Sequence, residues 1–496
     1  MVEYKKMSLL SSKNVDFLNM YIYNVNEKQM KEDYVMEIES IKDITEEISS
    51  LLEEKKYYEL KQILKELEPA DLAYILEDFP QKIGVLFRIL PKDLAAEVFV
   101  EMESDSQELL LSSFTDTEIK EILDELYIDD TVDVIEEMPA NVVKRILNNS
   151  DAETRKTIND ILKYPEDSAG SIMTTEYVRL DEDITVEDAL KRIRRTGIDK
   201  ETIYTCYVTK SDKTLLGYIT AKTLLLSDED MIIKDIMETN HIFAYTDEDK
   251  EVVARKMSKY DLLAIPVVDK SNRLVGIITV DDAIDVMEEE ATEDVEKMAA
   301  IIPSDKPYLS TSVFQIFKKR IPWLFLLMIS ATFTGAIITF FEDKLTSTIA
   351  GTVLIAFIPM LMDTGGNAGG QSSVTIIRGL AIEEIRMGDI LKILFKELRV
   401  SLLCASALSV VNFGKMMLID RLLLNNDAIT WKIALVVSLT LILVVVVAKL
   451  VGCSLPILAK RIGFDPAVMA SPFITTIVDA ISLLIYFNLS SALLHL

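Results

Sequence analysis

The chain has 496 residues, of which 27% are charged, and a formal net charge of -28. This length predicts several domains, and the acidic excess argues against nucleic acid as a partner because like charges repel. Since the whole excess lies before residue 321, we expect the N-terminal part to attract cations.

Short helices are predicted in the first part of the chain. Residues 1–40 show no interpretable pattern, and we expect a variable extension there. From residue 41 to residue 163 apolar residues recur at helical spacing, and segments end at Pro80, Pro91 and Pro139. Proline lacks the backbone N–H and clashes with the preceding turn, so it cannot continue a helix. The pattern predicts an acidic domain of stacked helices in a superhelix.

Two similar segments follow this domain. The sequence VTKSDKTLLGYIT at 208–220 is echoed by VDKSNRLVGIIT at 268–279, and an acid-led amphipathic helix pattern precedes each copy. A strand, a polar turn and a second strand are typical of a small α/β module. We expect modules at 164–235 and 236–284 that pack together, because one copy buries little core.

A charged helix and a linker at 285–320 lead to a mostly apolar region, 321–496. Since roughly twenty residues cross a bilayer, five helical spans are predicted, the second of them overlong and broken: 321–341, 345–377, 400–418, 433–448 and 471–494. Lys and Arg gather on the flanks that share a side with the N-terminal half. The positive-inside rule therefore predicts a cytoplasmic N-terminal half and an outer C-terminus.

The last predicted span carries one carboxylate, Asp479. On a helix, Thr475, Asp479 and Ser482 lie along one face. A charge at the bilayer centre costs about 2.5–3.5 kcal/mol, so this side chain should face protein or water. The polar stripe favours an ion path. The alternative is a protonated aspartate that donates a hydrogen bond to a neighbouring helix.

A second unusual stretch is FIPMLMDTGGNAGGQ at 357–371, whose proline and glycines predict a helix break inside the membrane. Unwound backbone there can direct carbonyl groups toward an ion. The alternative is close helix packing, since Gly366 and Gly370 form a G-x-x-x-G pair. Asp363, Asn367 and Gln371 favour an ion path, because a lipid-facing packing motif does not need them.

Acidic residues crowd two further segments, 129–137 and 281–294. A solvated helix face is the common meaning of such a charge run. However, two acidic surfaces on adjacent domains would repel each other unless divalent cations bridged them, and that arrangement would sense a cation. The sequence has no phosphate-binding loop or nucleophile motif, so we do not expect an enzyme.

Four ordered motifs resemble those of the MgtE-type magnesium channels: YPEDSAGSIMTTEYV (164–178), GGNAGGQ (365–371), LVGCSLP (450–456) and FDPAVMASPFITTIVD (464–479). The resemblance implies an α-helical superhelical N domain, tandem cystathionine-β-synthase (CBS) type α/β modules and a long plug helix. It also implies an all-α transmembrane domain of five helices, assembled as a homodimer with its pore on the twofold axis.

Site residues follow from this resemblance by position. Asp479 matches the family's pore carboxylate, and Gly366, Asn367 and Gln371 match the broken-helix motif, with Asp363 as an additional intramembrane acid. The acids that match regulatory Mg²⁺ ligands are Asp282, Asp285, Glu290, Glu293 and Asp294, with Asp129 and Asp133 as their N-domain partners. Some members of the family also bind ATP between the CBS modules, and no residue of this sequence settles that point.

Together these patterns predict a Mg²⁺-selective channel of the plasma membrane that imports Mg²⁺ and closes when cytosolic Mg²⁺ bridges the acidic surfaces. A double charge that crosses 100 mV gains about 4.6 kcal/mol, so import needs no chemical energy. Two alternatives remain open. One is a secondary carrier for an organic solute with Asp479 as its proton site, and the other is a membrane-anchored nucleotide sensor without transport.

Overall fold

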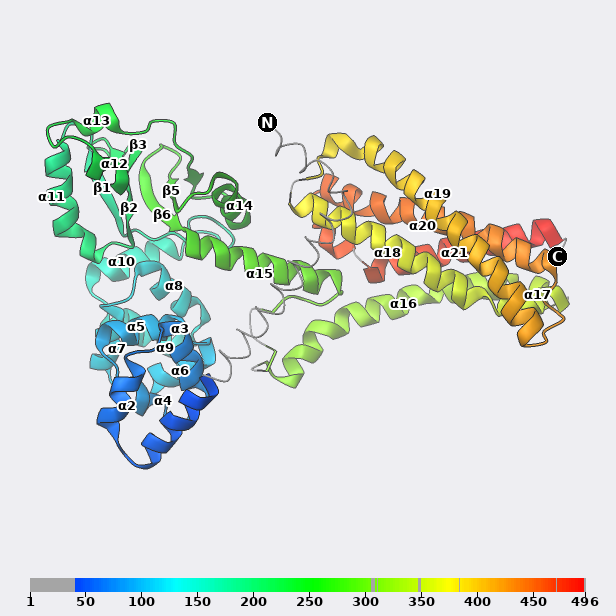
Figure 1. Ribbon diagram of the computed structural model, residues 1–496, viewed down its shortest axis with the longest axis horizontal. Helices are drawn as coiled ribbons and strands as arrows, with labels where there is room; N and C mark the ends of the chain where they lie inside the picture. Colours follow the sequence, from blue (N-terminus) through cyan, green and yellow to red (C-terminus); the bar gives the residue numbers. More distant parts are fainter. Residues whose placement is uncertain are drawn as a thin grey trace, which may run out of the picture. The chain divides into compact units, whose positions relative to one another are not determined.

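The computed structural model describes residues 41–304, 308–309, 311–346, 349–382, 384–469 and 471–494. The chain divides into two compact units, Met1–Val286 and Met287–Leu496 (Figure 1). The expected extension at 1–40 lies outside the described residues.

Stacked short helices form the first part of the first unit, as the sequence predicted, and Figure 1 draws them in blue to cyan. They are α2 (Tyr57–Leu64), α3 (Pro69–Glu77), α4 (Ile83–Phe87), α5 (Lys92–Val100), α6 (Ser104–Ser113), α7 (Asp116–Leu123), α8 (Ile128–Glu137), α9 (Ala140–Asn149) and α10 (Ala152–Ile161). Pro91 and Pro139 are the N-cap residues of α5 and α9. Each of these prolines therefore lies at the start of a helix, where its fixed φ is favourable, and so marks the end of the preceding segment.

Two three-stranded sheets make up the rest of the first unit. The first module contains β1 (Tyr177–Asp181), α11 (Val186–Thr196), η2 (Gly197–Asp199), β2 (Thr202–Thr209), β3 (Leu215–Thr220), α12 (Ala221–Leu226) and α13 (Ile233–Ile236). The second contains β4 (Ala244–Tyr245), α14 (Lys250–Tyr260), β5 (Ala264–Val268) and β6 (Leu274–Thr279). In each sheet a parallel pair is followed by an antiparallel pair. The repeat seen in the sequence is therefore a structural repeat.

The two modules pack against each other, as expected. Thr174, ahead of β1, exchanges backbone hydrogen bonds of 2.8 and 2.9 Å with Ile277 of β6. The repeated glycine has the same role in both copies. A Cβ at Gly217 would collide with the Glu238 carbonyl oxygen, and one at Gly276 would lie 2.7 Å from that of Thr174. Each sheet thus needs a glycine where another segment crosses it.

Helix α15 (Val280–Met298) contributes to both units. Its first turns bury Ala283 and Val286 in the core of the first unit. At its last residue, Met298 packs against Ile377 and Ala467 in the second unit. One uninterrupted helix therefore has one end in each core.

The second unit is helical and contains α16 (Val313–Thr346), α17 (Ile349–Ile355), α18 (Ile358–Ala381), η3 (Met387–Asp389), α19 (Ile390–Lys415), the π-helical η4 (Met416–Leu423), α20 (Trp431–Arg461), η5 (Pro466–Met469) and α21 (Ser471–Leu494). Helices α18, α20 and α21 lie side by side in Figure 1. Among the described residues, four segments are long and apolar enough to cross a membrane: 313–341, 387–423, 431–461 and 466–494. They match four of the five predicted spans. The remaining one, 345–377, corresponds to α17 and α18, so the count of five is not confirmed.

The second predicted span is broken, as expected, but the break lies beside Pro359 and not at the glycines. Helix α18 runs without interruption through all four glycines and carries Pro359 in its first turn, and the chain leaves helical geometry earlier, between α17 and α18. The reason is packing. The Cβ position of Gly369 lies 3.1 Å from the Ala448 carbonyl oxygen, and that of Gly365 lies 3.0 Å from the Ser482 Oγ. The glycines let α20 and α21 approach α18 closely, which was the alternative interpretation of this motif.

This close approach predicts a large difference between two glycine substitutions. A Cβ at Gly452 would collide with the Gly369 carbonyl oxygen, whereas one at Gly414 would meet nothing within 4 Å. We expect Gly452→Ala to lower stability by about 1–3 kcal/mol. Gly414→Ala, its control in helix α19, should raise stability by about 0.5–1 kcal/mol. Thermal unfolding of both purified variants checks this, and equal effects would contradict the packing account.

Candidate functional site

A polar stripe runs along one face of α18. Asp363, Asn367 and Gln371 follow one another at intervals of four residues and are exposed, whereas the glycines between them are buried. Polar side chains at this spacing share one face of a helix. Within a bilayer such a face is costly against lipid, so it must meet water or protein.

Asp479 lies beside this stripe, on α21. Its Oδ1 atom is buried, and no group of the described residues forms a hydrogen bond with it. The other carboxylate whose charge acts on Asp479 is Asp363 of α18. A cation would stabilise both the two repelling carboxylates and the buried oxygen that has no donor. The hydrogen bond to a neighbouring helix, which was the alternative role of Asp479, is not seen at this oxygen.

The two other residues predicted on the α21 stripe contact the glycines of α18. Thr475 packs against Gly366, since its Cγ2 atom lies 2.8 Å from the Cβ position of that glycine. Ser482 is 2% exposed and packs against Gly365 in the same way. Both therefore seat α21 on the glycines of α18, and Asp479 and the α18 stripe remain as the candidate ion path.

A second cluster of carboxylates lies in the first unit, between α8 and the two α/β modules. Asp129 and Asp130 occupy the first turn of α8, and Asp282 occupies the first turn of α15. Asp282 is the charged group that acts most strongly on Asp129. The structure thus brings together the two acidic surfaces that the sequence predicted would meet, at Asp129 and Asp282.

The carboxyl groups of this cluster are forced toward their protonated forms. Burial and the nearby charges raise the pKa of Asp130 and that of Asp282 to about 6. They raise the pKa of Asp129 well above its usual value. Its side chain is 6% exposed, and its Oδ1 has no hydrogen-bond partner among the described residues. Among the described residues, the charges that act most strongly on these three groups are negative.

Two further members of this cluster, Glu176 and Glu201, were missed in the sequence. Burial and the charge of Asp130 raise the pKa of Glu201 to about 8, and burial raises the pKa of Glu176. A signal was present: each glutamate immediately precedes one of two neighbouring parallel strands, β1 and β2. Parallel neighbours bring such positions side by side. The Glu176 Oε2 also accepts a hydrogen bond of 3.1 Å from the Ile128 amide, which anchors α8 to the module.

The cluster suits a hydrated ion better than a fully dehydrated one. Within the described residues, no three His, Cys, Asp or Glu side chains converge closely enough to bind a metal directly. Mg²⁺ dehydrates reluctantly and usually keeps several waters, so its carboxylate partners can stand further away. The orphaned oxygens of Asp129 and Glu201 are suited to accept hydrogen bonds from such waters.

The other predicted regulatory acids lie further along α8 and α15. Asp133 lies one turn further along α8, and Asp285, which is exposed, also acts on Asp282. Glu290, Glu293 and Asp294 belong to the part of α15 in the second unit.

Lys297 organises the end of α15 within the second unit. Its ammonium group lies 2.6 Å from a Glu293 carboxylate oxygen and 2.8 Å from one of Asp465. Asp465 also accepts a hydrogen bond of 2.8 Å from the Ala467 amide, just before α21. Glu293 is therefore held in an ion pair, and α15 is tied to the segment that leads into the candidate ion path.

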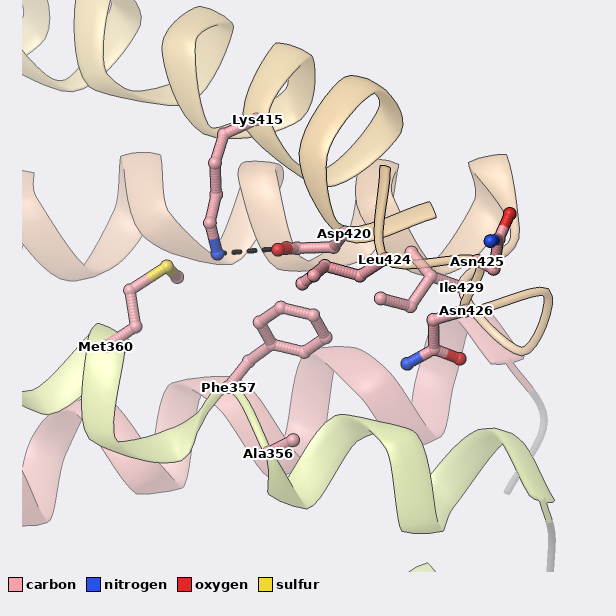
Figure 2. A pocket seen from close by; sticks show the side chains of 9 residues that line it. All are labelled: Ala356, Phe357, Met360, Lys415, Asp420, Leu424, Asn425, Asn426 and Ile429. Carbon is pink, nitrogen blue, oxygen red and sulfur yellow. Dashed lines mark ion pairs between the residues drawn. The ribbon is translucent and has the colours of Figure 1, made fainter. Parts of the chain in front are cut away.

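A pocket of about 490 Å³ lies elsewhere in the second unit, between the start of α18, the end of α19 and the loop before α20. Figure 2 shows the Lys415 ammonium and the Asp420 carboxylate facing each other above the ring of Phe357. The two groups form an ion pair of 2.9 Å. Because its charges are already balanced, this pocket is a weaker candidate for a cation than the Asp479 region.

Comparison with known families gives matches to three family models along the chain. Residues 67–167 match the MgtE intracellular N domain, 169–229 and 233–289 match CBS domains, and 358–489 match the MgtE divalent cation transporter domain. A magnesium transporter MgtE of Thermus thermophilus is 36% identical, over 90% of this chain and 98% of its own length. The chain belongs to the MgtE family.

A second relative supports this assignment. The magnesium transporter MgtE of Bacillus subtilis is 34% identical, over 90% of this chain and 96% of its own. A crystal structure of the cytosolic domain of the Mg²⁺ channel MgtE in complex with ATP covers 49% of this chain and 99% of its own, with 35% identity and a TM-score of 0.47. This chain is thus a multi-pass membrane protein of a magnesium transporter family, with a helical N domain, tandem CBS domains and an apolar helical domain.

The raised pKa values predict how pH acts on the acidic cluster of this MgtE chain. An acid whose pKa is raised by folding holds a proton that the opened chain would release, so the folded arrangement weakens as pH rises. The pH window begins at the ordinary pKa values, 3.8 for Asp and 4.5 for Glu, and extends to the raised pKa of Glu201, about 8. Without Mg²⁺, we expect hydrogen-exchange protection of α8, corrected for intrinsic rates, to fall between about pH 5 and pH 8.

Millimolar Mg²⁺ should restore that protection at the alkaline end of the window, because the ion replaces the lost protons. Glu201→Gln, which cannot ionise, should flatten the pH dependence. A protection profile that rises with pH would contradict the assignment.

Proposed function

We propose that this chain forms a homodimeric, Mg²⁺-selective channel that imports Mg²⁺ down the membrane potential. The observation that carries the proposal is the exposed stripe of Asp363, Asn367 and Gln371 beside Asp479. A face of this kind is stable inside a membrane only if it borders water or another subunit. In a symmetric dimer two copies of the stripe and of Asp479 would face one axis.

Conduction would use largely hydrated ions. Mg²⁺ sheds its waters reluctantly, so the carboxylates and amides of the stripe would hold it through those waters. The glycines of α18 contribute by packing rather than by presenting carbonyl groups, because α18 is continuous there. Selectivity would come from the fit of the path to the hydrated ion.

Closure would follow from the acidic cluster of the first unit. A cation among Asp129, Asp130, Glu201 and Asp282 would relieve a repulsion that burial strengthens. We infer that cytosolic Mg²⁺ holds the N domain, the CBS modules and α15 in this arrangement. Depletion of Mg²⁺ would then release α15, whose far end is tied to Asp465.

We also propose how the chain is placed in the membrane. The apolar side chains of α16 and α19, such as Phe333 at 71% and Leu403 at 74% exposure, would face lipid or the second copy. The first unit would lie in the cytoplasm and the C-terminus outside. The proposed boundaries are 1–40 for the extension, 41–163, 164–235 and 236–284 for the soluble domains, 285–320 for the plug helix and linker, and 321–496 for the transmembrane domain. We also propose that ATP binds at the CBS modules.

Mg²⁺ flux into liposomes that contain the purified protein tests the function. With a potential imposed by a potassium gradient, we expect flux that needs no proton gradient and stops when Mg²⁺ bathes the soluble domains. Flux that follows an imposed pH gradient would favour a proton-coupled carrier instead. No flux under either gradient would refute transport.

A further inference from the structure

A buried lysine lies inside the membrane unit, on α20. Lys449 is 6% exposed and is preceded by a buried apolar run that includes Val444, Val445 and Ala448. A charge in such surroundings is costly unless it is paired and hydrogen-bonded. Its presence in a domain that conducts a dication needs an explanation, because it has the same sign as the ion.

Lys449 is paired with groups from two other helices. Its Nζ lies 3.4 Å from the Glu397 Oε1 of α19 and 3.3 Å from the Ser372 Oγ of α18. The Ser372 hydroxyl also donates a hydrogen bond of 2.5 Å to the Glu397 Oε1. One carboxylate thus neutralises the lysine, and the three groups connect α18, α19 and α20.

This group lies next to the Gln371 end of the α18 stripe, because Ser372 is the residue after Gln371. The Cβ position of Gly369 is 3.1 Å from the Ala448 carbonyl oxygen on one side and 3.3 Å from the Val478 Cγ2 on the other. Lys449 and Asp479 are the next residues after these two contacts. The backbones of α20 and α21 at Lys449 and Asp479 therefore both lie near this glycine of α18.

We propose that Glu397 is a positioning residue for Mg²⁺ permeation, which holds Lys449 against α18 and cancels its charge beside the ion path. This inference rests on the proposed channel function. An uncompensated ammonium group in a low-dielectric domain would repel a dication at the Gln371 end of the path. Glu397 thereby allows a lysine to connect three helices without an electrostatic barrier to the ion.

Flux measurements on Glu397→Gln test this proposal, because the substitution keeps the shape and removes the charge. We expect the Mg²⁺ concentration for half-maximal flux to rise at least tenfold. In the double variant Glu397→Gln/Lys449→Met no charge remains, and this concentration should return to within about threefold of the wild-type value. Asp420→Asn is the matched control. It leaves Lys415 without its partner in the pocket of Figure 2, and the half-maximal concentration should not change.

The outcomes separate this proposal from the proposed function. Absence of flux in the wild-type protein would refute the channel itself. Wild-type flux with an unchanged half-maximal concentration in folded Glu397→Gln would overturn the role of Glu397 and leave a purely structural connection. If Glu397→Gln does not fold, the same flux measurement on the exchanged pair Glu397→Lys/Lys449→Glu tests the proposal. A half-maximal concentration within about threefold of the wild type supports charge compensation, and a larger shift overturns it.

Discussion

Replacement of Asp479 by asparagine is expected to lower Mg²⁺ flux by about a hundredfold at unchanged protein yield. The substitution keeps the shape of the side chain and removes its charge, and in a dimer it removes two charges that would face one dication. The buried Oδ1 of Asp479 has no hydrogen-bond partner among the described residues. A neutral amide there would still need partners but would no longer attract the ion. Liposome flux under an imposed potential measures the effect.

Ser482→Ala is the matched control, one turn further along the same helix. Its hydroxyl packs against Gly365, and its removal leaves the charge of the path intact. We expect flux within about threefold of the wild type. If Asp479→Asn also conducts at the wild-type rate, Asp479 has a structural role, and the ion site must be sought at Asp363 and the rest of the α18 stripe.

Removal of both members of the regulatory pair, in Asp129→Asn/Asp282→Asn, should produce a protein that conducts but no longer closes. We expect the Mg²⁺ concentration on the side of the soluble domains that halves the flux to rise at least tenfold, because two buried charges that attract the cation are gone. Maximal flux at low Mg²⁺ should be unchanged. Asp282→Ala/Asp285→Ala should shift the same concentration in the same direction.

Two acids on α11 provide the control for regulation. Glu187 and Asp188 also occupy the first turn of a helix, but they are exposed and pair with Lys191. Glu187→Gln/Asp188→Asn should leave inhibition by Mg²⁺ unchanged. Equal shifts in both double variants would mean that total acidic charge, rather than the buried cluster, sets the response.

Much of the fold could be predicted because it depends on local patterns. Pro91 and Pro139 mark the helix boundaries of the N domain through their own backbone chemistry, and the repeated Gly217 and Gly276 mark the two CBS modules. The glycines of α18 were harder to interpret. A helix break and a close contact between helices both favour glycine, so the sequence alone does not distinguish them. The positions of α20 and α21 against α18 show that these glycines serve close contact.

The same limit applies to the sites. The intervals of four between Asp363, Asn367 and Gln371 predict a shared helix face directly. Glu201, in contrast, gains its significance from a strand register and from Asp130, which is far away in the chain. Lys449 was overlooked because a single lysine in an apolar span has no local pattern, and its partner Glu397 lies on another helix.

Helix α15 carries carboxylates that follow one another at intervals of four along its exposed surface, such as Asp281, Asp285 and Glu289. Each such pair of like charges weakens a helix by about 0.2–0.5 kcal/mol. The connection between the two units is thus a rod whose stiffness depends on ionic conditions. We expect cations bound between these carboxylates to stiffen the rod and their loss to loosen it, so that the ion signal and the mechanical coupling would be lost together.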